Sequence, residues 1–153
     1  ILIGHLVGER RVKTAYILGC YTRRVAIITA ASLSVVLAMC GGKVLSWLTD
    51  NEAIVSLGII IMWVQVALEI GRAINIWATQ ALRATGDVNF QFYVGITVQW
   101  LVSVVLSYLL GVHWGFGLIA MWASFALDEN IRGLIFIYRW KSMKWSTKSF
   151  VKD

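Results

Sequence analysis

Four long apolar stretches constrain what this 153-residue chain can fold into. Each holds at least 20 residues, and short polar breaks separate them; they cover residues 22–48, 53–82, 90–110 and 118–138. A helix needs about 20 apolar residues to cross the hydrocarbon core of a membrane. We therefore predict an all-α fold, a polytopic membrane helix bundle of about four transmembrane helices, preceded at residues 1–8 by the end of another helix.

The composition excludes an ordinary soluble domain. Hydrophobic residues make up 59% of the chain and charged residues 14%, whereas soluble domains are about 25% charged. The four stretches leave almost no sequence for an extramembrane part, so we expect residues 1–153 to form a single membrane domain. Cys20 and Cys40 fall on one predicted helix about 30 Å apart, which rules out a disulfide bond between them.

The basic residues mark the edges of the predicted spans. The net charge is +6, but these residues do not gather on one face among exposed aromatics, so we expect no nucleic acid partner. One side of the bundle holds Arg10, Arg11, Lys13, Arg23, Arg24, Arg83, Arg139, Lys141, Lys144, Lys148 and Lys152, and the other holds Lys43. Positive charge favours the cytoplasmic side, so both ends of the chain, with a tail at 139–153, are predicted to be cytoplasmic.

Four tryptophans fall near the ends of the predicted spans. Trp47 and Trp114 lie at the outer boundary, and Trp140 and Trp145 at the inner one. Indole rings are enriched where hydrocarbon meets headgroups. We therefore expect these four side chains to anchor the bundle at the two membrane surfaces.

Two groups of charged and amide residues stand well inside the predicted spans, where a charge at the helix centre costs about 2.5–3.5 kcal/mol. The second span holds one group and the fourth span the other: Glu69, Arg72 and Asn75, then Asp128, Glu129 and Arg132. Within each group an acid lies three or four positions from a base, so the two can pair on one helical face. We expect the first group to form one continuous polar stripe.

Two interpretations of these groups stay open. In the first, each group is a neutralised set of ion pairs that holds helices together, since breaking a buried pair is costly. In the second, at least one carboxylate titrates or binds a cation in an ion relay, because carboxylates inside membranes commonly mark ion pathways. Three acids, Glu69, Asp128 and Glu129, face two bases, Arg72 and Arg132. One carboxylate therefore lacks a full partner, which favours an ion-coupling or gating role.

Indoles and side-chain amides away from the boundaries form a second set of candidates. These are Trp63, Gln65, Gln99, Trp100 and Trp122. Together they suit a cavity for planar or cationic ligands. The alternative is that they face lipid or pack between helices.

No pattern typical of catalysis is visible. The sequence lacks a Ser, His and acid arrangement, a phosphate-binding glycine loop and a paired histidine motif. His5 and His113 stand alone, so we expect no metal centre. A divalent ion at Asp128 and Glu129 would need more acidic ligands than this chain supplies. We therefore predict that the chain is not an enzyme and needs no cofactor.

The order of several short segments resembles one family. A Gly-rich helix end with a charged residue comes first, and two spans close on polar turns: Gly4-His5-Leu6-Val7-Gly8-Glu9, Leu48-Thr49-Asp50 and Ala81-Leu82-Arg83-Ala84-Thr85-Gly86-Asp87. Three further segments follow: Leu106-Ser107-Tyr108-Leu109-Leu110, Gly115-Phe116-Gly117-Leu118-Ile119-Ala120-Met121-Trp122 and Tyr138-Arg139-Trp140. Together they resemble the C-terminal part of multidrug and toxic compound extrusion (MATE) transporters.

The resemblance implies that the chain is a fragment of a C-terminal lobe. Residues 1–8 would then end the eighth helix of a twelve-helix protein, and the four spans would be helices nine to twelve. Its partners would be the lipid bilayer, a small-molecule substrate and the missing N-terminal lobe of the same protein. It also implies a bacterial or archaeal inner (plasma) membrane.

The function implied is secondary active export of amphipathic or cationic small molecules by antiport with sodium or protons. Two alternatives remain at this point. One is a flippase for lipids or polysaccharide precursors, which shares a two-lobe architecture by analogy. The other is a structural membrane subunit whose charged groups only hold partner helices together.

Overall fold

The computed structural model describes residues 1–148, and every regular element within that range is a helix. In chain order these are α1 (Leu2–Gly8), α2 (Val12–Leu48), α3 (Glu52–Ala84), α4 (Val88–Val98), the π-helices η1 (Gln99–Leu106) and η2 (Leu109–His113), α5 (Gly117–Lys141) and the 3-10 helix η3 (Lys144–Lys148). The all-α prediction is confirmed.

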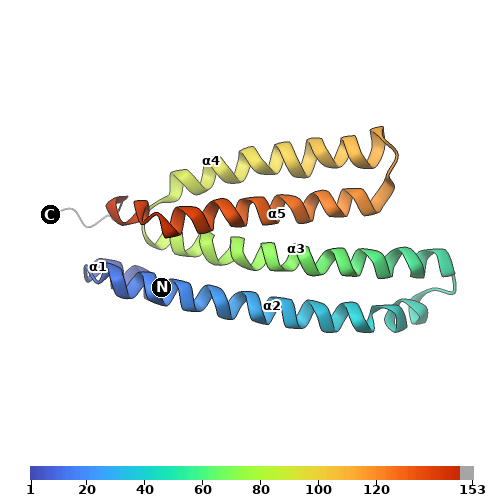
Figure 1. Ribbon diagram of the computed structural model, residues 1–153, viewed down its shortest axis with the longest axis horizontal. Helices are drawn as coiled ribbons and strands as arrows, with labels where there is room; N and C mark the ends of the chain where they lie inside the picture. Colours follow the sequence, from blue (N-terminus) through green and yellow to red (C-terminus); the bar gives the residue numbers. More distant parts are fainter. Residues whose placement is uncertain (149–153) are drawn as a thin grey trace.

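The long helices lie side by side in the order α2, α3, α5, α4 (Figure 1). Helix α3 packs against both α2 and α5, while η1 and η2 continue α4 along the other side of α5. The short helix α1 and the α3–α4 turn lie at one end of the bundle, together with the end of α5. The α2–α3 turn and the connection into α5 lie at the other end.

Three of the expected spans are confirmed by length and composition. Val12–Leu48, Glu52–Ala84 and Val88–His113 are long and apolar enough to cross a membrane. Helix α5 has 25 residues, about 37 Å at 1.5 Å per residue, but it is not among these candidates. It carries charged residues from its middle to its C-terminal end, and those near the middle are paired within the bundle. The fourth span at 118–138 therefore remains a prediction.

Two helices extend beyond the predicted spans. Helix α2 begins at Val12 rather than near residue 22, because Lys and Arg are good helix formers and do not interrupt it. The helical segment formed by α4, η1 and η2 continues through Gly111 to His113. A Cβ atom at Gly111 would lie 2.3 Å from Cγ of Met121, so this glycine allows close packing on α5 rather than ending the helix.

The tail predicted at 139–153 is partly helical. Its first residues complete α5, and Lys144–Lys148 forms η3. The remainder of the tail lies outside the described residues.

The aromatic core lies at the end of the bundle that holds η3. The rings of Trp140 and Trp145 stack with centroids 4.5 Å apart, and Trp77 meets Trp140 edge-on at 5.3 Å. Both Trp140 and Trp145 are fully buried, so their prediction as membrane anchors was wrong. Tertiary partners from α2 and α3 take the place of lipid headgroups. Trp47 and Trp114, by contrast, are 84% and 60% exposed, which suits a membrane boundary.

Helices α3 and α5 approach each other most closely at Gly71. A Cβ atom at this position would lie 2.8 Å from the backbone nitrogen of Asn130 and 2.9 Å from the backbone carbon of Glu129. Small residues allow such close backbone contact between membrane helices. The side chain of Asn130 adds a hydrogen bond across the contact, donating to the carbonyl of Ala67 at 3.0 Å.

Substitution of Gly71 tests this contact. We expect Gly71→Ala to destabilise the full-length protein by about 1–3 kcal/mol, because the new methyl group meets backbone that cannot rotate away. The matched control is Gly95→Ala, where a Cβ would meet nothing within 4 Å. Thermal unfolding in detergent measures both. Equal unfolding midpoints for the two variants would contradict the close contact.

Candidate functional site

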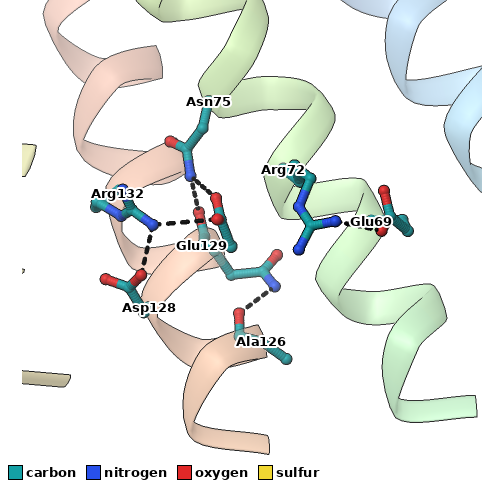
Figure 2. A network of polar contacts seen from close by, with 8 residues as sticks. Glu69, Arg72, Asn75, Ala126, Asp128, Glu129 and Arg132 are labelled. Atoms are coloured by element: carbon teal, nitrogen blue, oxygen red, sulfur yellow. Dashed lines mark hydrogen bonds and ion pairs between the residues drawn. The ribbon is translucent and has the colours of Figure 1, made fainter. Parts of the chain in front are cut away.

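Arg132 of α5 holds two carboxylates at once. Its Nη2 atom lies 2.5 Å from Oδ2 of Asp128 and 3.1 Å from Oε1 of Glu129 (Figure 2). The three residues are four and three positions apart on one helix, and the structure forms both of the pairs that this spacing predicts. One guanidinium therefore serves two acids.

Asn75 of α3 completes this cluster from the neighbouring helix. Its amide nitrogen donates to the backbone carbonyl of Glu129 at 2.8 Å and to Oε2 of the same residue at 2.5 Å. On the same helix, Arg72 pairs instead with Glu69 at 2.8 Å. The expected continuous stripe of Glu69, Arg72 and Asn75 was wrong, because Asn75 turns to α5 while the other two pair with each other (Figure 2).

Gln65 links the Glu69 pair to α5. Its amide nitrogen donates to Oε1 of Glu69 at 2.5 Å, and its carbonyl oxygen accepts a hydrogen bond from the indole of Trp122 at 2.7 Å. A polar chain therefore runs from Trp122 through Gln65 and Glu69 to Arg72. Of the residues that the sequence marked as substrate-lining candidates, Gln65 contacts a charged residue directly, and Trp122 is linked to it through Gln65.

A cavity of about 340 Å³ lies between α3, η1 and α5. Its walls combine charged, amide, hydroxyl and aromatic side chains: Leu68, Arg72, Gln99, Ser103, Val104, Trp122, Phe125, Asp128, Glu129 and Arg132. Six of these are residues that the sequence marked as candidates. Ser103 and Phe125 were missed, since a single Ser or Phe in an apolar helix carries no signal of its own.

Burial within the chain differs sharply among the charged groups. The side chain of Asp128 is 3% exposed, those of Arg132 and Glu129 are 17% and 18% exposed, and those of Glu69 and Arg72 are 29% and 45% exposed. Oδ1 of Asp128 and Nε of Arg132 are buried without a hydrogen-bond partner in residues 1–148. The most buried carboxylate thus keeps one oxygen unused.

Two of the predicted aromatic candidates stand apart from this cavity. Trp63 and Trp100 are 51% and 63% exposed and do not line it. A second, mainly apolar cavity of about 340 Å³ lies between α2 and α3, and its walls include Ser34, Gln65 and Glu69. Glu69 therefore faces a different cavity from Asp128.

An ion pair that the sequence did not reveal lies at the end of α5. Arg139 donates to both oxygens of Asp87 in the α3–α4 turn, at 2.6 and 3.1 Å, and its guanidinium lies 4.5 Å from the ring centre of Phe90. These hydrogen bonds raise the pKa of Arg139 above its ordinary value. The pair ties the α3–α4 turn to α5. The two residues are 52 positions apart, so no local spacing could indicate them.

Comparison with known proteins now identifies the chain. The sequence pattern of the MatE family matches residues 1–109. The chain belongs to the MatE family. An uncharacterized transporter of Bacillus subtilis (strain 168), YisQ, is 32% identical to it over 148 residues, which cover 97% of this chain. The chain spans 32% of the length of that relative. No solved structure matches.

Membership of the MatE family confirms the resemblance predicted from the ordered segments. MatE is a family of transporters and YisQ is named a transporter, which confirms the prediction that the chain is not an enzyme. The MatE match ends at residue 109, so the carboxylates of α5 lie beyond it. The similarity to YisQ extends over nearly the whole chain and is not confined to the first three spans.

Removing Arg132 should destabilise the protein far more than removing Arg72. We expect Arg132→Met to cost about 3–5 kcal/mol, since it leaves two largely buried carboxylates without their shared cation. Arg72→Met is the matched control, and because its side chain is 45% exposed we expect a cost of about 1 kcal/mol or less. Denaturation of the full-length protein in detergent measures both. A larger loss for Arg72→Met would contradict the cluster described here.

Proposed function

We propose that this MatE chain is part of a secondary active transporter that exports amphipathic or cationic small molecules by antiport with sodium or protons. The observation that carries the proposal is the cavity that holds Asp128, Glu129 and Arg132 between membrane helices. Ionisable groups at such depth are costly and mark ion pathways. The coupling and gating candidates are Glu69, Arg72, Asn75, Asp128, Glu129 and Arg132.

The charge balance supports exchange of a cation. Over both cavities together, three carboxylates and two guanidinium groups leave a net charge of −1 when all are ionised, while the four charged residues that line the Asp128 cavity sum to zero. A site of this kind binds either a coupling ion or a cationic substrate but not both, which is the requirement for antiport. A basic cavity would instead favour a flippase for anionic lipid carriers, and this cavity is not basic.

The walls of the cavity suit the proposed substrates. Trp122 and Phe125 present aromatic surface beside Asp128, and an organic cation binds to such a combination by charge and by contact with the rings. Small-molecule sites occupy about 300–1,000 Å³, so this cavity is at the lower end of the range. We propose that the missing N-terminal lobe supplies the rest of the substrate site.

Neutralising each carboxylate tests the coupling role. We expect Asp128→Asn, Glu129→Gln or Glu69→Gln in the full-length protein to lower ion-driven dye efflux by about tenfold or more, since an ion-coupled site loses its charge. Glu52→Gln is the control, because Glu52 lies in the exposed first turn of α3. Unchanged efflux in all three variants would refute the coupling role. Preserved efflux after exchanging Glu69 and Arg72 would favour the structural alternative.

We propose that both ends of the chain face the cytoplasm of a bacterial or archaeal cell. The basic residues support this orientation, since most of them lie at the end of the bundle that holds α1 and the α3–α4 turn. Lys43, by contrast, lies near the α2–α3 turn at the opposite end.

Cysteine labelling tests the orientation. In a variant lacking Cys20 and Cys40, we expect an impermeant maleimide to label Asp50→Cys in intact cells and to leave Lys141→Cys unlabelled until the cells are opened. Both positions are exposed in the structure. The reverse pattern would place the chain the other way round.

A further inference from the structure

Arg23 of α2 is a half-buried cation without an acid partner. Its guanidinium lies over the ring of Trp77 in α3, 5.5 Å from the ring centre. Its Nη1 atom is buried and has no hydrogen-bond partner in residues 1–148. A buried donor without an acceptor is costly. The position therefore calls for an anionic group that the described part of the chain does not supply.

The acids at this end of the bundle are engaged elsewhere. Within residues 1–148, the acids at the end that holds α1 and the α3–α4 turn are Glu9 and Asp87. Glu9 pairs with Arg11, and Asp87 pairs with Arg139. Arg24, next to Arg23, is exposed and forms no ion pair with the described residues either. This end of the bundle therefore carries positive charge that no acid of the described chain balances.

Arg23 and Arg24 lie where the membrane-spanning part of α2 ends. Trp47, near the other end of α2, is 84% exposed and suits a membrane boundary. Arg24 precedes Trp47 by 23 positions, which is about 35 Å along a helix. The hydrocarbon core of a membrane is about 30 Å thick. We therefore expect both guanidinium groups at the level of the lipid phosphates.

The mainly apolar cavity between α2 and α3 begins about two helical turns from Arg23. Its wall includes Ala30 and Ser34, which follow Arg23 by seven and eleven positions and so share its face of α2. Ala30 lies about 10 Å from Arg23 along the helix axis. Since Arg23 also contacts α3 through Trp77, the guanidinium and the cavity belong to one groove between the two helices.

The polar groups in the wall of this cavity already have partners. Glu69 accepts hydrogen bonds from Gln65 and Arg72. The hydroxyl of Ser34 donates to the backbone carbonyl of Ala31 at 3.1 Å. The rest of the wall is apolar and gains nothing from a polar ligand. The cavity therefore suits a hydrocarbon chain.

A lipid chain has access to the cavity and sufficient length to reach it. Leu33 and Leu37 form part of the wall and are exposed, so a chain can enter from the outer side of α2. One leaflet contributes half of the hydrocarbon core, about 15 Å. A chain that starts at the depth of Arg23 therefore reaches Ala30 and the beginning of the cavity.

We propose that an anionic phospholipid binds in the groove between α2 and α3, with its phosphate on Arg23 and Arg24 and one acyl chain in the cavity beyond Ala30. A guanidinium binds phosphate oxygens through paired hydrogen bonds. Basic residues at a membrane surface attract anionic headgroups, whereas the ammonium of a zwitterionic headgroup would meet the unbalanced positive charge of this end. The inference goes beyond the antiport function and does not depend on it.

Binding of phosphatidylglycerol is the test. The full-length protein is purified in detergent and stripped of lipid. Its thermal unfolding is then followed while dioleoyl-phosphatidylglycerol replaces dioleoyl-phosphatidylcholine in mixed micelles at constant total lipid. A ligand that binds the folded state raises the unfolding temperature with its concentration. We expect phosphatidylglycerol to raise the unfolding midpoint of the wild type, and Arg23→Gln to weaken the apparent affinity for this lipid by about tenfold.

A matched control separates the site from general attraction to the basic end. Arg83 is an exposed base in the last turn of α3 and does not line the cavity. Arg83→Gln removes the same charge from the same end of the bundle. We expect this variant to keep the response of the wild type to phosphatidylglycerol.

A second pair of variants tests the acyl chain without changing any charge. Ala30→Phe fills the cavity, and we expect it to weaken the apparent affinity for phosphatidylglycerol by about tenfold. Ser32→Phe places the same ring at an exposed position of α2 that does not line the cavity, so the response should stay unchanged. If Arg23→Gln does not fold, the comparison of Ala30→Phe with Ser32→Phe decides the outcome.

Several results would overturn the lipid site. One is an equal effect of the two lipids on the wild type, and another is the same rise in midpoint with inorganic phosphate in place of the lipid. Equal responses of Ala30→Phe and Ser32→Phe would exclude the chain from the cavity. If Arg23→Gln responds to phosphatidylglycerol like Arg83→Gln but is less stable without lipid, Arg23 pairs with an acid in the rest of the protein and not with a phospholipid.

Discussion

The shared ion pair of Arg132 is the interaction on which the rest of this bundle depends. An apolar helix crosses a membrane unaided, but α5 carries three charged residues near its middle, and they are tolerated only when paired. Pairing within α5 is incomplete, since one guanidinium serves two carboxylates. Asn75 of α3 supplies the missing donor. Helix α5 therefore belongs beside α3 for electrostatic reasons, and Gly71 allows the two backbones to come close enough.

The two ends of α5 are held in different ways. Toward η3, the stacked rings of Trp140 and Trp145 and the pair of Arg139 with Asp87 fix the helix against α2, α3 and the turn into α4. In the middle of α5, the contacts are polar and involve few atoms. Apolar packing is non-directional, whereas hydrogen bonds between charged groups require a defined geometry. Burial of apolar surface thus holds the end of α5, whereas directional hydrogen bonds fix the orientation of its middle.

The sequence alone predicted the helices and the ion pairs within one helix, but not the contacts between residues that are far apart in the chain. Length and hydropathy located the long helices, and spacings of three and four predicted the pairs of Arg132. The partner of Glu129 is 54 positions away, so no periodicity could predict Asn75. Hydropathy also cannot distinguish an α-helix from the π-helix that brings Gln99 and Ser103 to the cavity. The three confirmed spans could be predicted because lipid acts on each helix separately, while the site depends on contacts between helices.

Helix α3 separates two cavities that are coupled through its own side chains. Glu69 lies in the wall of the cavity toward α2, and Asp128 lies in the wall of the cavity toward η1. Gln65 contacts Glu69 and accepts a hydrogen bond from Trp122, which lines the second cavity. Any sliding of α5 along α3 must break this hydrogen bond together with the one from Asn75 to Glu129. A change of charge at Glu69 therefore alters a hydrogen-bonded chain that reaches the wall of the second cavity.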